Sequence, residues 1–348
     1  MLAKNNYQTE NSIKDIVLAV TYQCNGRCKF CNIWKEKDVS SLPATIYKNL
    51  PRNTQNINIT GGEPFLREDL AEVVRMIVRQ CPRAKIIIST NGFSPSLIKK
   101  RLQEILRLKR DIGLAVSLDG FGRVHEELRG FPGGFSLALE TIRLSRELGI
   151  KNIKIAFTLT DFNFKQLKKI YRLSKEMRTE FTFSVLHNSS HYFKKTNNLI
   201  SESNRIKKEI SWLISQEINQ LSVKRWLRAY FAHGMIQFLK NNQRILPDYS
   251  GQESVFIDPV GDIYPSNVWD FKLGNLKSVT DWVSFLKKAI RQMETEARPS
   301  SWMICTARQA MRKNWKKVAV WILMKKISFL KTGQRGFRRF ETIVRKTS

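Results

Sequence analysis

Three cysteines lie close together near the start of the chain. Cys24, Cys28 and Cys31 are separated by three and two residues, whereas Cys81 and Cys305 stand alone. An odd number of cysteines, in a sequence whose first residues show no apolar signal peptide, argues against a disulfide framework. Thiolates at this spacing can ligate one metal centre from one side. The spacing therefore predicts a metal centre; the alternative is three cysteines buried without a ligand.

Two kinds of metal centre fit three clustered cysteines. A structural zinc ion needs four ligands in a closed tetrahedron, and the next candidates, Cys81 and His125, are distant in sequence. A cubane 4Fe–4S cluster held by three thiolates leaves one iron open to a substrate or cofactor. The sequence therefore favours one 4Fe–4S cluster, and zinc with a distant fourth ligand is the alternative.

The eight residues from Cys24 to Cys31, with the aromatic Phe30 directly before the last cysteine, resemble the CxxxCxΦC loop of the radical S-adenosylmethionine (radical SAM) enzymes. The resemblance implies that the open iron binds the methionine amino and carboxylate groups of S-adenosylmethionine. It also implies an external one-electron donor, flavodoxin-like or ferredoxin-like, that reduces the cluster. The cofactor is then cleaved to a 5′-deoxyadenosyl radical, which abstracts hydrogen from a substrate.

Further motifs strengthen this resemblance. The turn Thr60-Gly61-Gly62-Glu63-Pro64 lets the backbone approach a ligand closely and offers a carboxylate to an ammonium group, and it is similar to the family motif that binds the methionine amino group. The segment from His125 to Gly130 is similar to an H-x-x-x-R-G stretch whose arginine pairs with the cofactor carboxylate. By resemblance, the end of the fourth predicted strand lies along the cofactor, but Asp119 at that end could equally cap the following turn. By resemblance, the cofactor-binding residues are Gly61, Gly62, Glu63, Pro64, Asn91, Ser117 and Arg129.

These residues must be positioned by the elements around them. Short Val/Ile-rich runs without clean alternation, typical of parallel strands covered on both faces, are separated by helix-like stretches. The predicted strands are 16–21, 57–60, 85–90, 113–119, 153–160 and 181–186, and the intervening helices include 67–80, 95–109, 137–148 and 164–177. Six successive βα units predict an α/β fold, a (βα)6 partial TIM-like barrel over residues 14–230. In such folds the loops after the strands build the active site.

The sequence after the predicted barrel differs in composition: residues 247–276 are rich in Gly, Pro, Asp and Asn and contain short β-like runs. Residues 231–310 predict a small α+β extension, with a hairpin turn at Val260-Gly261-Asp262. Segments 256–265 and 273–276 resemble the SPASM/twitch extension of many radical SAM enzymes. Ser266 stands where cluster-bearing members have a cysteine, and Cys305 alone cannot hold a cubane. We therefore expect a degenerate extension without an auxiliary cluster.

The charge of the chain is strongly positive, with 60 Lys and Arg against 30 Asp and Glu. Residues 1–13 form a polar N-terminal segment, and residues 311–348 predict a basic helical tail. In that tail, paired lysines flank an apolar stretch from Trp315 to Lys326, which suits an interfacial helix on an anionic membrane. A helix docked on the barrel through Trp321 and Leu323, with its lysines in water, is the favoured alternative, and nucleic acid is the least favoured partner of the tail. No apolar run is long enough to span a bilayer, so we expect a cytoplasmic protein that is peripheral at the inner membrane face.

The substrate is not specified by these motifs. We favour a small-molecule, sugar or lipid-linked precursor, then a ribosomally made peptide, then RNA. The rival from another class is a non-catalytic zinc-binding module with a nucleic-acid or membrane surface.

Overall fold

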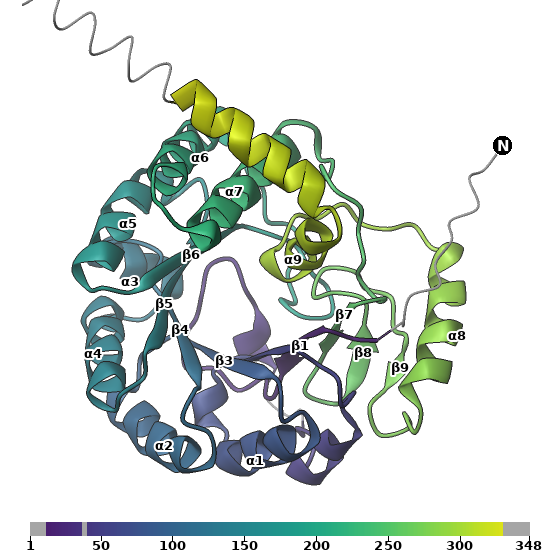
Figure 1. Cartoon of the computed structure of the whole chain (residues 1–348). Coiled ribbons are helices and arrows are strands. Elements are labelled where there is room, and N and C mark those ends of the chain that lie inside the picture. The colour runs from purple at the N-terminus through teal and green to yellow at the C-terminus, as the bar shows by residue number, and fades with distance from the viewer. Residues whose placement is uncertain (1–11, 37–39, 330–348) are drawn as a thin grey trace, which may run out of the picture.

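The computed structural model describes residues 12–36 and 40–329, and a nine-stranded sheet in the order β6-β5-β4-β3-β2-β1-β7-β8-β9 forms its centre (Figure 1). The first six strands pair in parallel and curve into a partial barrel. Their bounds are β1 (Asp15–Ala19), β2 (Asn56–Thr60), β3 (Lys85–Thr90), β4 (Gly113–Ser117), β5 (Asn152–Leu159) and β6 (Glu180–Val185). Each lies within two residues of its predicted range, so the predicted α/β barrel is confirmed.

Helices cover the outer face of the curved sheet (Figure 1). They are α1 (Leu70–Gln80), α2 (Pro95–Leu108), α3 (Arg123–Arg129), α4 (Gly134–Glu147) and α5 (Leu167–Glu176). In α1, apolar residues at helical spacing, among them Val73, Val74 and Ile77, are fully buried against the strands. The burial of this apolar stripe holds the helix on the barrel.

The inner face of the barrel is polar, which the sequence analysis did not foresee. In β5, burial alternates strictly: Ile153, Ile155, Phe157 and Leu159 are buried, and the residues between them are only partly buried. Alternation of this kind arises when the two faces of a strand meet different surroundings. The outer face of β5 belongs to the hydrophobic core, whereas its inner face lines a cavity.

The predicted helix 67–80 begins three residues late, at Leu70. Arg67 is instead extended, and its guanidinium donates to the carbonyls of Val20 at 2.7 Å and Leu42 at 2.6 Å. It also pairs with Asp69 at 2.6 Å. These tertiary bonds, which local sequence does not reveal, take the place of the first helical turn.

The region after the barrel extends the same sheet. Helices α6 (Ser203–Ile218) and α7 (Val223–Asn241) pack together beside β6, and β7 (Ser254–Ile257) then pairs in parallel with β1. The strands β8 (Asp262–Tyr264) and β9 (Gly274–Asn275) follow antiparallel, and α8 (Trp282–Glu294) lies beyond them. The predicted hairpin turn is present, with Gly261 at φ +93°. A domain boundary at residue 231 stays a prediction.

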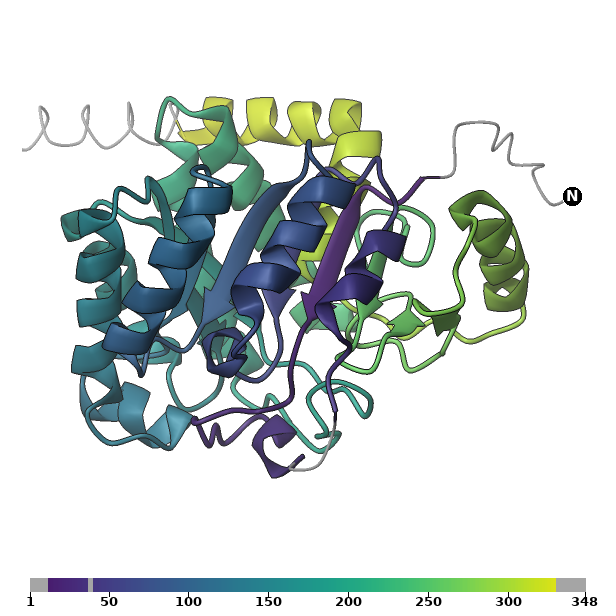
Figure 2. The ribbon, with the colours of Figure 1, turned by 90° about the horizontal axis from the view of Figure 1, so that it is seen from below.

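Two helical segments end the described chain. α9 (Ile304–Lys313) lies at the amino end of the barrel, where Arg308 and Gln309 both bond Asp15 at the start of β1. Residues 315–329, which we call the tail helix, run across the same end, opposite the cysteine segment (Figure 2). Residues 330–348 of the predicted tail and residues 1–11 lie outside the described residues. Among the described helices, none is long and apolar enough to cross a membrane.

Candidate active site

The three clustered cysteines follow β1 at the carboxyl end of the barrel, and each is partly buried. Burial raises the pKa of Cys24 and of Cys31 to about 12, and the neighbouring Cys28 is the second-largest cause of the increase. The pKa of Cys28 is also raised by burial. Without a ligand these thiols are therefore neutral, and a metal would displace their protons. As they stand, no three His, Cys, Asp or Glu side chains in residues 12–36 and 40–329 converge as ligands of one metal ion.

The end of α3 holds one side of the cysteine segment. The N–H groups of Arg27 and Lys29 donate to the carbonyls of Arg129 and Leu128, both at 2.9 Å. Gly130 has φ +60°, and a Cβ there would lie 2.4 Å from the carbonyl oxygen of Arg27. The backbone of Arg129 and Gly130 therefore packs closely against the cysteine segment and fixes its conformation.

The loop between β6 and α6 holds the other side. The N–H of Asn32 donates to the carbonyl of Phe193 at 2.8 Å, and the side-chain amide of Asn198 donates to the carbonyl of Phe30 at 3.1 Å. In the same loop the buried Tyr192 bonds Thr60 at 3.0 Å and the carbonyl of Gly61 at 3.2 Å. Tyr192 was not predicted from the sequence, where the aromatic pair Tyr192-Phe193 within a largely polar loop is the local signal.

Gly61 and Gly62 bring two strand-end loops into direct contact. The N–H of Gly62 donates to the carbonyl of Thr21, and the N–H of Glu63 to that of Gln23, both at 2.8 Å. A Cβ on Gly61 or Gly62 would lie 2.3 or 2.2 Å from those same carbonyl oxygens. Glycine is therefore required at both positions because the turn after β2 lies directly against residues 21–23, which lead into the cysteine segment.

Glu63 ties the ends of β2 and β3 together. Its fully buried carboxylate accepts from the N–H of Asn91 at 2.7 Å, the hydroxyl of Thr90 at 2.8 Å and the N–H of Phe65 at 3.3 Å. Burial raises the pKa of Glu63 to about 7, although these donors oppose the shift. Pro64, which follows, begins a short 3-10 turn, Pro64–Leu66. In the structure Glu63 is therefore a positioning residue for the backbone of the turn.

Arg129 and Asp119 form a buried ion pair beside the cysteines. Arg129 Nε lies 2.5 Å from Asp119 Oδ2, and Arg129 Nη1 lies 3.7 Å from the sulfur of Cys28. The second oxygen of Asp119 accepts the N–H of Thr158 at 2.6 Å, and the N–H of Asp119 donates to His125 Nδ1 at 3.0 Å. His125 and Asp119 thus hold the arginine in place, so Asp119 does more than cap a turn.

The remaining candidates lie at the same end of the barrel. Asn91 donates from its side chain to Asn25 Oδ1 at 2.7 Å, which links β3 to the cysteine segment. Ser117 is the last residue of β4 and is partly buried. The lone cysteines lie apart from this cluster: Cys81 donates to the carbonyl of Pro51, and Cys305 lines the barrel cavity. The hydroxyl of Ser266 accepts from the N–H of Trp269 at 3.2 Å within a turn.

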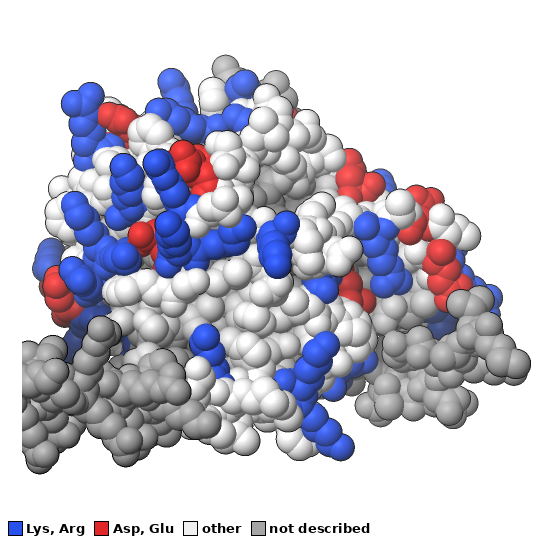
Figure 3. Space-filling view, turned by 90° about the horizontal axis from the view of Figure 1, so that it is seen from above, with Lys and Arg blue, Asp and Glu red and all other residues white. Residues whose placement is uncertain are grey.

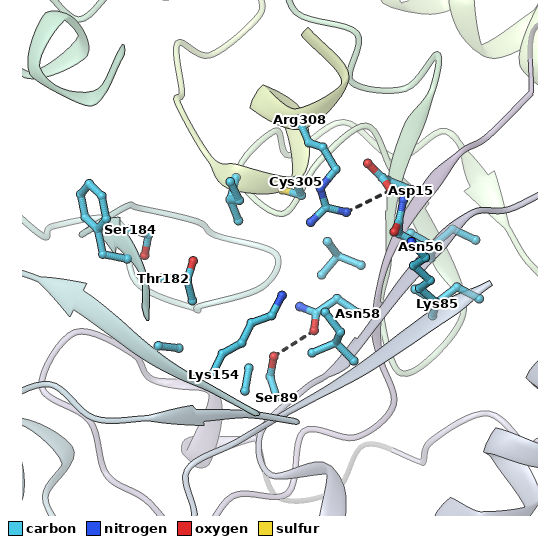
Figure 4. A pocket seen from close by; sticks show the side chains of 18 of the residues that line it. Asp15, Asn56, Asn58, Lys85, Ser89, Lys154, Thr182, Ser184, Cys305 and Arg308 are labelled. Atoms are coloured by element: carbon cyan, nitrogen blue, oxygen red, sulfur yellow. Dashed lines mark hydrogen bonds and ion pairs between the residues drawn. The ribbon is translucent and has the colours of Figure 1, made fainter. Parts of the chain in front are cut away.

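A cavity of about 230 Å³ occupies the interior of the barrel (Figure 4). Lys154 points into it from β5, beside Asn58 and Ser89, whose side chains bond at 2.9 Å. Burial lowers the pKa of Lys154 to about 8. Its nearest carboxylate, on Glu180, is 4.0 Å away and also pairs with Lys224 and Arg228. Lys154 is therefore a partly buried cation with little compensating charge.

The comparisons with known proteins agree with this site. The fold and the site define an α/β partial barrel with a three-cysteine segment after its first strand. Residues 18–174 match the family described as the radical SAM superfamily, so this part of the chain is a radical SAM domain, and members of that superfamily use a 4Fe–4S cluster and S-adenosylmethionine.

Curated relatives match about half of the chain. Proteins named "Probable GTP 3',8-cyclase" from Saccharolobus islandicus and Metallosphaera sedula are 29% and 27% identical over 175 residues, which is 47% of this chain. The match covers 54% and 53% of those proteins, so the chain spans about half the length of the curated relatives it matches.

Solved structures share the fold over more of the chain. Streptococcus suis SuiB bound to S-adenosylmethionine aligns with a TM-score of 0.56 and 18% identity, covering 79% of this chain and 65% of that one. Native anSMEcpe with bound AdoMet and Cp18Cys peptide aligns with a TM-score of 0.61 and 15% identity, covering 91% and 99%. At these identities the similarity establishes the fold alone.

Proposed function

We propose that this chain is a radical SAM enzyme in which Cys24, Cys28 and Cys31 hold one 4Fe–4S cluster. When bound and reduced by an external flavodoxin-like or ferredoxin-like donor, that cluster cleaves S-adenosylmethionine and supplies a 5′-deoxyadenosyl radical for hydrogen abstraction. The observation that carries the proposal is the meeting of the cysteine segment, the glycine turn and the Arg129–Asp119 pair at one end of the barrel, where hydrogen bonds join them.

The chain's own residues have distinct tasks in this proposal. Gly61, Gly62 and Pro64 present the turn backbone to the cofactor, and Glu63 and Asn91 fix that turn against the cysteine segment. Arg129 uses Nε for Asp119 and Nη1 for Cys28, and in the described part of the chain its Nη2 makes no hydrogen bond. That donor is available for a cofactor carboxylate. Ser117 would contact the cofactor from the end of β4.

The substrate we propose is a small molecule, sugar or lipid-linked precursor that bears an anionic group. The support is Lys154, a partly buried cation in the barrel cavity, where a phosphate or carboxylate would offset the cost of its burial. The curated relatives are named for GTP, and the anSMEcpe structure contains a peptide. A phosphate-bearing small molecule fits the cavity better than a peptide, because its charge is concentrated.

The test is a measurement on anaerobically purified, iron- and sulfide-reconstituted protein. We expect about four irons per chain, the content of one 4Fe–4S cluster. Adding S-adenosylmethionine and dithionite should then produce 5′-deoxyadenosine. Zinc with no cofactor cleavage would support the binding-module alternative, and about eight irons would mean a second cluster in the extension.

A further inference from the structure

The tail helix carries a stripe of exposed apolar side chains. Trp315, Leu323 and Ile327 lie at multiples of four residues, with Val320 and Met324 on the adjoining row. The exposed fractions of Leu323 and Met324 are 61% and 67%. Side chains of this kind normally turn toward a core, so their outward direction needs an explanation.

The opposite face of the tail helix is already docked on the protein. Trp321 packs edge-on against Tyr230, with ring centroids 5.3 Å apart, and stacks on His233 at 4.8 Å. Val318 is buried, and the ammonium of Lys326 lies 3.7 Å from the centroid of the Trp226 ring. The docking expected through Trp321 is therefore present, whereas Leu323, expected to dock with it, is exposed on the other face of the helix.

A second group of apolar side chains continues the stripe. Leu221, Val223 and Leu227, at the start of α7, are 94%, 63% and 37% exposed. An apolar groove joins them to the tail helix, lined on one side by Val223, Trp226 and Leu227 and on the other by Trp315, Ala319 and Leu323. We call the whole surface the tail-helix face; its exposed residues are Leu221, Val223, Leu227, Trp315, Val320, Leu323, Met324 and Ile327. A contiguous apolar surface of this kind marks an interaction site.

The charges around the tail-helix face are mostly positive; Glu253, which pairs with Arg312 and Lys313, is an exception. Two lysine pairs lie near the ends of the stripe, Lys316 and Lys317 after Trp315 and Lys325 and Lys326 before Ile327, and within the described residues none of these four pairs with a carboxylate. Segments 219–247 and 299–329, which build the face, contain no Asp or Glu. Figure 3 shows this side of the molecule, where basic side chains surround an uncharged area and acidic ones are few.

We propose that the tail-helix face docks on the surface of an anionic lipid bilayer. The apolar stripe enters the headgroup region, and the flanking lysines lie against the lipid phosphates. The exposed side chains are mostly aliphatic and cannot stack on bases, which disfavours RNA. A second copy of the chain would place lysines against lysines across a symmetric interface, which disfavours self-association.

This docking would set the amino end of the barrel toward the membrane and leave the cysteine segment on the far side (Figure 2). Arg308 lines both the apolar groove and the barrel cavity. A single side chain of α9 therefore lies between the surface that meets the lipid and the cavity that contains Lys154. The proposal itself does not depend on the radical chemistry.

The experiment is flotation of the full-length protein with vesicles of phosphatidylglycerol and phosphatidylcholine, compared with phosphatidylcholine alone. We expect binding to the anionic vesicles that weakens as salt is raised. The double substitution Leu323→Ser/Met324→Ser should weaken binding about tenfold or more, because both side chains lose burial in the headgroup region. Lys316→Gln/Lys325→Gln should weaken it about fivefold per charge on anionic vesicles only.

Matched controls lie on α8, on a different side of the molecule (Figure 1). Lys287→Gln/Lys288→Gln and Val283→Ser change exposed residues of the same types and should leave vesicle binding unchanged. Formation of 5′-deoxyadenosine by the same preparations reports separately on the radical chemistry. The proposal is overturned if wild type does not float, or if single-stranded RNA is bound instead. It is also overturned if Leu323→Ser/Met324→Ser converts a dimer into monomers without affecting flotation.

Discussion

Arg129 Nε lies 2.5 Å from Asp119 Oδ2, and neither side chain is more than one tenth exposed. This ion pair stands at the point where the end of β4, the end of α3 and the cysteine segment meet. Because Asp119 Oδ1 accepts the N–H of Thr158 and the backbone N–H of Asp119 donates to His125 Nδ1, Asp119 is fixed at both its side chain and its backbone, beside the guanidinium that contacts Cys28. Asp119 therefore positions a cation where thiolate charge would develop.

Replacing Asp119→Asn should destabilise the protein strongly. Arg129 would remain buried without its counter-charge, which costs on the order of 3–5 kcal/mol. Chemical denaturation of the metal-free protein measures this loss, and binding of S-adenosylmethionine should weaken in parallel. Asp111→Asn is the matched control, because Asp111 pairs with Lys109 but is 72% exposed. Its expected cost is below about 1 kcal/mol, and equal losses for the two variants would contradict the assigned role.

Removing one clustered thiol should abolish cofactor cleavage. In Cys28→Ala two cysteines remain in the segment, too few for a cubane bound by three thiolates, so iron content and 5′-deoxyadenosine should both fall to background. Cys305→Ala alters a cysteine outside the segment and should retain the cluster. Cleavage that persists in cluster-depleted Cys28→Ala would refute the mechanism.

Gly62→Ala should disturb the cysteine segment without altering any ligand. The new Cβ would lie 2.2 Å from the carbonyl oxygen of Gln23, so the two loops must separate. We expect iron incorporation to fall severalfold. Gly149→Ala is the control: it introduces a side chain at φ +85° into open space, at a cost of about 1 kcal/mol. It should leave iron content unchanged, so stability loss alone cannot account for a difference.

The barrel could be predicted because its signals are local. Val/Ile runs, helical periodicity and turns mark each βα unit, and the cysteine spacing marks the metal segment by itself. What could not be predicted were the bonds that join distant segments. The task of Glu63 became visible only with Thr90 and Asn91 beside it, and Tyr192 reaches Gly61 across 131 residues. The polar barrel interior escaped prediction because Lys154 and Thr158 resemble exposed residues in sequence.

Replacing Lys154→Met should stabilise the protein at neutral pH. The charged form is disfavoured by burial, so the native pKa of about 8 lies below the ordinary value of 10.5. The penalty is fully present below pH 8, shrinks between pH 8 and 10.5 as the native state loses its proton first, and is absent above. It amounts to about 3 kcal/mol at most. Denaturation across this pH range should show the gain of the variant disappearing.

The same variant should lose affinity for anions. Pyrophosphate and GTP should raise the melting temperature of the wild type and have a smaller effect on Lys154→Met. Lys151→Met, an exposed lysine one residue before β5, is the control and should change neither quantity. Equal effects of anions on wild type and Lys154→Met would exclude the cavity as the anion site.

The two faces of the tail helix should respond differently to truncation. Trp321→Ala removes a ring that packs on Tyr230 and His233, so we expect a loss on the order of 2 kcal/mol in the free energy of unfolding. Leu323→Ala, two residues later, removes an exposed side chain and should cost below about 0.5 kcal/mol. Urea denaturation in the absence of lipid measures both. A comparable loss for Leu323→Ala would mean that this side chain is covered by the protein itself, which would remove the basis for lipid docking.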